Sequence, residues 1–178
     1  MKYIKLLENF DSYDPYELMI MFPNKKAEMI IQEIGKYDPN LNLVRDLITL
    51  GANVNWQDDR SQTLLHEAAR YGEIEIARML IEAGANLNAQ DKYGLTPLHR
   101  AAGNGRVKIV QMLIDAKANL DVQDNDGNTP LHRAASWGRV EVVRMLIGAG
   151  ARKDIPDGDG ELPYGYAYTS ELKKLLKP

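Results

Sequence analysis

The chain has 178 residues, of which 44% are hydrophobic and 26% charged, so its composition is that of a folded globular protein and excludes a wholly disordered one. Its formal net charge of -3 excludes a global positive field that would hold nucleic acid or an anionic membrane. The absence of cysteine excludes disulfide bonds, thiolate zinc sites and cysteine nucleophiles.

Residues 1–24 differ from the rest of the chain, and we interpret them as an N-terminal capping segment. The apolar stretch after Met1 is too short and too interrupted by acidic residues for a signal peptide, and no run in the chain has the length of a membrane span. We therefore expect a cytoplasmic protein. Residues 2–9 fit a short helix, and Asp14 and Pro15 fit an N-cap and a first turn. Pro23 is expected to interrupt the chain, and a docking segment is the alternative interpretation.

A repeat of 33 residues follows this segment. All three histidines, His66, His99 and His132, stand at this spacing in the similar segments TLLHEAAR, TPLHRAAG and TPLHRAAS. An aspartate before each histidine, and a glycine and an MLI segment after it, recur at the same spacing. A fixed period of this length is typical of stacked repeat proteins, in which no unit buries its apolar face alone.

Each unit has the pattern of two helices and a turn. In the unit at 91–123, Thr96 is a favourable N-cap, Pro97 fits the first helical position, and Gly105 ends the first helix. The second helix is expected to begin near Val107, because apolar residues then recur at helical spacing. Segments rich in Asp, Asn and Gly separate the units and predict tight turns.

The predicted fold is an all-α solenoid of helix-turn-helix units with short β-turn fingers, with about five units including the caps. We expect one domain over residues 1–178. Its expected parts after the N-terminal segment are a capping repeat at 25–57, full repeats at 58–90, 91–123 and 124–156, and a partial C-terminal capping repeat at 157–178.

The segment Asp91–Asn119 resembles the ankyrin repeat. It contains nearly all of the family pattern D-x-x-G-x-T-P-L-H-x-A-A, followed by a glycine, an apolar second helix and a segment close to G-A-x-x-N. The resemblance is strong from Asp58 to Pro156, covers the second half of 25–57, and is weak at 157–178.

The resemblance implies a structural role for the histidines. In this family the histidine bonds to the threonine three residues before it and to the backbone of the adjoining repeat. The implied pairs are Thr63–His66, Thr96–His99 and Thr129–His132. A metal site is the alternative, but repeats stack about 10 Å apart, whereas zinc needs its nitrogen ligands about 2 Å from one ion. The row of histidines therefore cannot converge on one metal.

Some positions depart from the pattern. Ser61 replaces the turn glycine and Leu64 replaces the proline, so the first full finger is expected to be less regular. Lys117 occupies the left-handed cap position that Gly84 holds one repeat earlier. Gly165 replaces the histidine in the last unit, which fits a terminal cap.

No segment has the complete pattern of a catalytic or ligand-binding site. The segment DIPDGDGE at 154–161 has acidic residues but lacks the full frame of a calcium loop. The segment GNG at 103–105 lies between two helices and lacks the strand and lysine of a phosphate-binding motif. No serine has a plausible histidine and acid partner once the histidines are structural. We therefore expect no enzyme activity, no cofactor and no metal.

The resemblance implies protein–protein interaction through a concave surface, which ankyrin proteins form from variable first-helix positions and turn tips. Tyr, Trp and Arg at such positions are the residue types most enriched in binding hot spots. The candidate partner-binding residues are Arg60, Glu67, Arg70, Tyr71, Lys92, Tyr93, Arg100, Asn104, Asp126, Arg133, Ser136 and Trp137.

These residues predict a surface that is basic and aromatic at its centre and acidic at the fingers nearer the C-terminus. The expected partner is therefore another protein with an acidic patch, and neither nucleic acid nor a membrane. We expect a monomer. The alternative function is a dedicated inhibitor or immunity-type protein that blocks one partner enzyme or toxin, similar to small ankyrin proteins encoded beside bacterial toxins.

Overall fold

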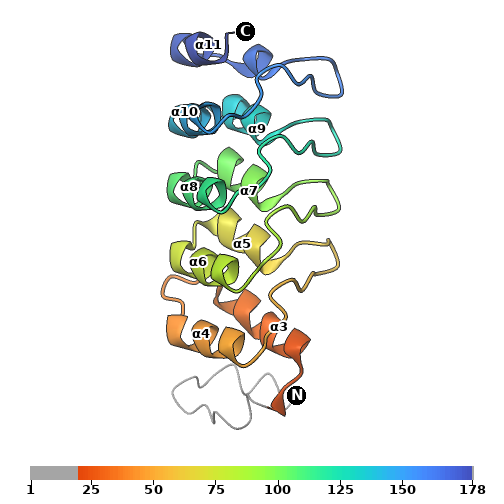
Figure 1. Ribbon diagram of the computed structural model, residues 1–178, viewed down its shortest axis with the longest axis vertical. Coiled ribbons are helices and arrows are strands. Elements are labelled where there is room, and N and C mark those ends of the chain that lie inside the picture. Colours follow the sequence, from red (N-terminus) through yellow and green to blue (C-terminus); the bar gives the residue numbers. More distant parts are fainter. Residues whose placement is uncertain (1–19, 178) are drawn as a thin grey trace.

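The computed structural model describes residues 20–177, and this part of the chain is a stack of helix pairs (Figure 1). It contains nine α-helices and one short 3-10 helix, which confirms the predicted all-α solenoid. The α-helices are α3 (Pro23–Glu33), α4 (Leu41–Thr49), α5 (Leu64–Tyr71), α6 (Ile74–Glu82), α7 (Pro97–Gly103), α8 (Val107–Asp115), α9 (Pro130–Ser136), α10 (Val140–Gly148) and α11 (Ser170–Leu176). The elements expected within residues 1–19 lie outside the described residues.

The helices form two columns. The first helices α5, α7 and α9 lie between the fingers and the second helices α6, α8 and α10 (Figure 1). α7 packs between α5 and α9, and each first helix also packs on the second helix of its own pair. The fingers and the first helices therefore share one side of the stack, which we call the first-helix face.

The first helices begin at the residues that the sequence predicts. Thr96 is the N-cap of α7, and its side-chain oxygen accepts a hydrogen bond from the backbone nitrogen of His99. Pro97 follows as the first helical residue. α7 ends at Gly103, and Gly105 has a φ of 68°, which turns the chain into α8.

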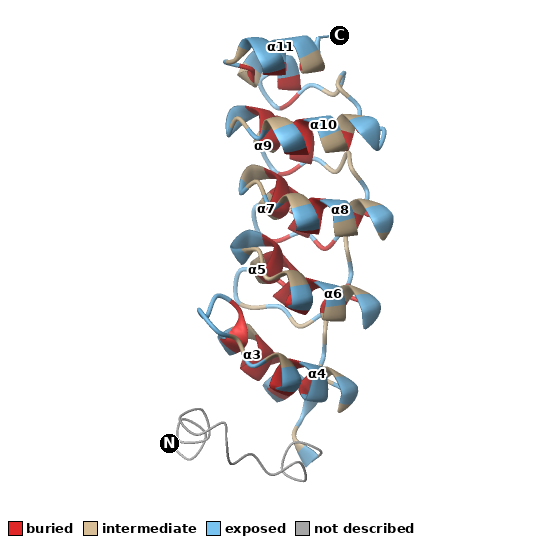
Figure 2. Ribbon diagram, turned by 90° about the vertical axis from the view of Figure 1, so that its left-hand side faces the viewer, coloured by how far each residue is buried: buried red, intermediate tan, exposed pale blue. Residues whose placement is uncertain are grey.

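Small and aliphatic side chains fill the space between the columns. Ala101 and Ala102 of α7 are fully buried, as are Val110 and Leu113 of α8. The alanines let neighbouring first helices approach closely, and the larger side chains fill the space between pairs. Buried residues run along the inner sides of all the helices, with exposed residues on their outer sides (Figure 2). The core is therefore shared between units, as expected for a solenoid.

Backbone hydrogen bonds join the fingers of successive units. The backbone nitrogen of Lys92 donates to the carbonyl of Arg60 at 2.9 Å, and that of Asn125 donates to the carbonyl of Tyr93 at 3.0 Å. The fingers consequently form one connected edge of the molecule.

The first full finger is regular, so the expectation drawn from Ser61 is wrong. Ser61 takes a φ of 57°, and its backbone nitrogen donates to the carbonyl of Asp58 at 2.9 Å. In the next finger, Gly94 has a φ of 75° and donates to the carbonyl of Asp91 at 2.8 Å. The turn bonds thus hold a serine in the left-handed region where glycine is preferred. Lys117 has a φ of 67°, so its predicted left-handed conformation is confirmed.

A proline and a glycine mark the two ends of the stack. Pro23 begins α3, because its fixed φ fits the first helical position, and Met21 and Phe22 just before it are not helical, so the expected break in the chain lies at this proline. At the other end, a 3-10 helix at Pro163–Tyr166 takes the place of a first α-helix, and it contains Gly165 at the position of the histidine.

Candidate functional site

The three histidines are buried, and their side chains connect neighbouring units. Nδ1 of His99 accepts a hydrogen bond from the backbone nitrogen of Thr96 at 3.1 Å, and its Nε2 lies 2.9 Å from the carbonyl oxygen of Asn128 in the next unit. Both contacts recur at His66 and His132, which confirms the three predicted Thr–His pairs and the predicted bond to the adjoining repeat. Burial lowers the pKa of His99 to about 4, so this side chain is neutral in the folded protein.

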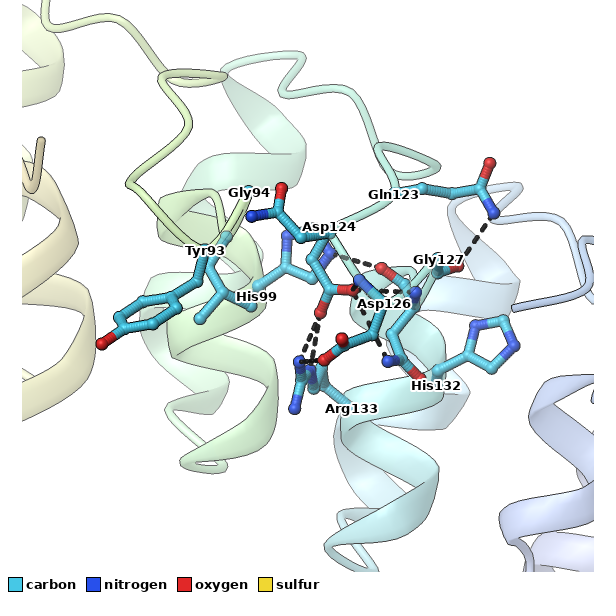
Figure 3. A network of polar contacts seen from close by, with 12 residues as sticks. Tyr93, Gly94, His99, Gln123, Asp124, Asp126, Gly127, His132 and Arg133 are labelled. Carbon is cyan, nitrogen blue, oxygen red and sulfur yellow. Dashed lines mark hydrogen bonds and ion pairs between the residues drawn. The ribbon is translucent and has the colours of Figure 1, made fainter. Parts of the chain in front are cut away.

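A buried ion pair lies next to two of these histidines. Oδ1 of Asp91 accepts hydrogen bonds from two backbone N–H groups of its own turn, and Nη2 of Arg100 lies 2.6 Å from its Oδ2. Asp124 and Arg133 repeat this arrangement one unit later, at 2.5 Å (Figure 3). Both aspartate side chains have 0% exposure, so each buried carboxylate has its own cation.

This pairing corrects the interpretation of a freely basic centre. Arg100 and Arg133 neutralise their own turn aspartates, and their side chains are only 21% and 32% exposed. Arg133 also lies 3.7 Å from the exposed carboxylate of Asp126. These two arginines therefore offer a partner less positive charge than the sequence suggested.

The units on either side lack this ion pair. Glu67 occupies the position of Arg100 one unit earlier, so Asp58 has no arginine across from it. Oε2 of Glu67 lies 3.6 Å from Nη1 of Arg70, and its Oε1 is buried without a hydrogen-bond partner among residues 20–177.

In the last unit Tyr166 stands at this position. Its hydroxyl donates to Oδ2 of Asp157 at 2.5 Å, and this hydrogen bond raises the pKa of Tyr166 to about 12. Oδ1 of Asp157 also accepts the backbone N–H groups of Asp159 and Glu161. The acidic segment at 154–161 thus uses this carboxylate to close a turn.

Three candidate residues expose much of an aromatic ring. The exposed fractions are 46% for Tyr71, 50% for Tyr93 and 62% for Trp137. The guanidinium of Arg70 lies 5.2 Å from the ring centroid of Tyr71, and the ammonium of Lys92 lies 4.9 Å from that of Tyr93. The aromatic half of the predicted surface is therefore accessible.

The remaining candidates are polar and lie on the same face. Asn104 donates from Nδ2 to the carbonyl of its own helix at 2.8 Å, and Ser136 donates from Oγ in the same way at 3.3 Å. Arg60 and Asp126 are exposed in their fingers. All the candidate residues thus lie on or at the ends of the first helices and in the fingers.

A pocket of about 280 Å³ lies between α7 and α9 on the first-helix face. It is lined by Leu95, His99, Arg100, Gly103, Asn104, Arg133, Trp137 and Arg139. A Cβ atom placed on Gly103 would lie 3.6 Å from Cδ1 of Trp137, so the glycine leaves space directly beside the indole.

Arg139 and its counterpart Arg106 were missed in the sequence interpretation. Nε of Arg139 donates to the carbonyl of Gly103 at 3.0 Å, and Nε of Arg106 donates to the carbonyl of Arg70 at 3.1 Å. Within residues 20–177, neither has a carboxylate at ion-pairing distance. Their signal in the sequence is an arginine directly after Gly105 and Gly138, the glycines between the two helices of the second and third full repeats, at the 33-residue spacing.

Two kinds of feature are missing from the part of the chain that the structure describes. Residues 20–177 contain no group of three or more histidine or acidic side chains placed to hold a metal ion. No helix in the same range is long and apolar enough to cross a membrane.

Comparison with known protein families matches residues 35–124 and 91–157 to ankyrin repeats, described as three copies. Comparison with curated proteins finds no match.

Proposed function

Because the chain belongs to the ankyrin repeat family, whose repeats are generally modules for protein–protein interaction, we propose that it binds a partner protein through its first-helix face. The family is typically non-catalytic. In this proposal the helix pairs at 25–57 and 157–178 cap the array, and the three repeats between them carry the binding surface.

The exposed aromatic rings are the observation that carries the proposal. Within residues 58–156, the large hydrophobic side chains that are exposed are Tyr71, Tyr93 and Trp137. All three lie at the ends of first helices or in a finger, and none lies on the second helices. Aromatic residues with exposed apolar surface and a polar surround are typical of binding hot spots. The asymmetry between the two sides of the stack therefore favours the first-helix face.

Site-specific photo-crosslinking in the cells that produce the protein tests this proposal. A photoreactive phenylalanine replaces Tyr93 or Ser136 on the first-helix face, and Arg78 or Gln111 on the second helices as matched exposed controls. We expect a discrete adduct with another protein from the first pair and none from the second pair. Adducts that form equally from both pairs, or only from the second helices, would contradict the proposal.

With the partner in hand, Trp137→Ala is expected to weaken binding by about 2 kcal/mol, the size expected of a hot spot. Arg78→Glu on α6 is the control and is expected to leave the affinity unchanged. Isothermal titration calorimetry measures both.

A further inference from the structure

The pocket between α7 and α9 has a specific chemistry. Its eight lining residues include three arginines and one tryptophan but no carboxylate. Two of the arginines, Arg100 and Arg133, are held in place by fully buried aspartates. A guanidinium has five N–H donors, and these ion pairs leave some of them unused. The pocket therefore presents fixed donors to a group that accepts hydrogen bonds.

Arg139 supplies the positive charge that the other two arginines lack. Its Nε bonds to the carbonyl of Gly103, and this bond fixes the guanidinium at the edge of the pocket. Its two Nη groups have no partner among residues 20–177, and no carboxylate in that range neutralises it. An anionic ligand in the pocket would gain an ion pair here without breaking one.

Trp137 supplies an apolar wall next to these donors. The indole is 62% exposed, and the absence of a side chain at Gly103 leaves its Cδ1 and Nε1 edge open. Asn104 stands at the position that Tyr71 and Trp137 occupy in the neighbouring units, and this smaller side chain leaves room beside the indole. A ligand that matches the arginine donors and the indole is a carboxylate with an apolar group beside it.

The size of the pocket points to part of a polypeptide. Pockets for small-molecule ligands and cofactors are usually about 300–1,000 Å³, and 280 Å³ is below that range. A phosphate backbone would also have to pass the exposed carboxylate of Asp126, which is 80% exposed beside Arg133. An acidic peptide segment avoids both the small size of the pocket and the repulsion by Asp126, because it places only one carboxylate in the pocket and can direct its other side chains away.

We infer that the α7–α9 pocket binds a carboxylate side chain of an acidic partner segment together with a neighbouring apolar side chain, with Arg139 forming the ion pair and Trp137 the apolar contact. This inference rests on the proposed function and names the chemistry of the partner. It also places the main positive charge on a residue outside the set predicted from the sequence.

A peptide titration tests the inference without the natural partner. The probe is the capped tripeptide acetyl-Glu-Phe-Glu-amide, and its neutral match is acetyl-Gln-Phe-Gln-amide. The readout is the indole N–H resonance of Trp137, assigned with Trp137→Phe. We expect saturable shifts with a Kd of about 1 mM for the acidic peptide, and binding at least about fivefold weaker for the neutral one. Added salt should weaken only the acidic peptide, because it screens the ion pair.

Two variants locate the binding site. Arg139→Met should weaken the acidic peptide at least about fivefold. Arg106→Met is the matched control, because Arg106 makes the same backbone bond one unit earlier but does not line this pocket. Gly103→Leu should abolish the shifts by filling the space beside the indole; a Cβ at this position meets Trp137 at an ordinary contact distance of 3.6 Å, and an unchanged circular dichroism spectrum checks that the larger side chain leaves the fold intact.

Several outcomes would overturn the inference. Equal binding of the two peptides, equal effects of the two arginine variants, no shift up to about 10 mM peptide, or tighter binding of an oligothymidylate at Trp137 would each do so. The crosslinking experiment above does not depend on this pocket. A partner captured on the first-helix face despite a negative peptide titration would leave the proposed function intact and reject the acidic segment alone.

Discussion

The first and second full units have the same turn but surround its aspartate differently. In the second unit, Asp91 is 5% exposed and Arg100 closes over its second oxygen. In the first unit, Glu67 stands where that arginine would be, and Asp58 is only half-buried. Nevertheless Oδ1 of Asp58 accepts two backbone N–H groups, each at 2.8 Å, as Asp91 does in its own turn.

This difference separates two tasks of the aspartate. Its bonds to the backbone shape the turn, and they suffice even where Ser61 replaces glycine. The arginine is needed only where the carboxylate is fully buried, because an unpaired charge in a dry environment is strongly unfavourable. The second and third units thus have a buried ion pair on the first-helix face, whereas in the first unit Glu67 stands in place of the arginine.

The largest expected effect comes from removing the cation of the second unit. Arg100→Met should lower the free energy of unfolding by about 3–5 kcal/mol, because it leaves the carboxylate of Asp91 buried and unpaired. Glu67→Met at the matched position should change it by less than about 0.5 kcal/mol, since within residues 20–177 Oε1 of Glu67 has no hydrogen-bond partner and Oε2 loses only a 3.6 Å contact with Arg70. Urea unfolding measures both. Equal losses would show that the two units do not differ in this way.

Stability at low pH tests a feature that both units share, a buried and neutral histidine. Burial lowers the pKa of His99 to about 4, below its value of about 6.5 in the unfolded chain. As the pH falls, His99 is therefore protonated in the unfolded chain before it is protonated in the folded protein. Its contribution to the free energy of unfolding is fully present above pH 6.5 and is lost as the pH falls to about 4. The loss is about 3 kcal/mol over this window.

The variant His99→Gln, which cannot titrate, isolates this contribution. Its free energy of unfolding should fall less than that of the parent between pH 7 and pH 4.5, as urea unfolding at both values would reveal. His66→Gln should act in the same direction, because burial also lowers the pKa of His66. If the free energy of unfolding changed with pH in the same way for the parent and the variants, these histidines would not be neutral buried groups.

A gain is expected where the first unit is given the missing cation. Glu67→Arg should raise the free energy of unfolding by about 1 kcal/mol, because the new guanidinium can reach the carboxylate of Asp58 and removes a like charge beside it. The variant loses only the contact of Glu67 with the half-exposed Arg70, which is 3.6 Å long and so contributes little to stability. Thermal unfolding provides the measurement, and a lowered Tm would mean that the first unit cannot form the pair.

The smallest expected effect concerns the left-handed residues. Ser61→Gly should raise the free energy of unfolding by up to about 1 kcal/mol, because it relieves the positive φ of 57°. Lys117→Gly should act similarly at its φ of 67°. Both gains are reduced by the greater freedom of glycine in the unfolded chain. A loss of stability in either variant would show that its side chain contributes contacts that outweigh the strain.

The periodic and local features of this protein were determined by its sequence. The start of α7 at Pro97 depends on residues next to it in the sequence, so the local pattern predicts it, and the resemblance to the ankyrin repeat implies the Thr–His pairs. The exposed aromatic residues were also found in this way, because Tyr71, Tyr93 and Trp137 stand at positions that the repeat core does not need.

The charge of the first-helix face was decided only by the tertiary structure. Arg100 and Arg133 are alike in the sequence to any free surface arginine, and only the fold of the finger back onto the helix brings a buried aspartate to each. The pocket likewise depends on contacts between units, where Arg139 reaches the carbonyl of Gly103 and Trp137 lies beside that glycine. Such contacts depend on how closely the units stack, and the packing of the shared core sets that distance.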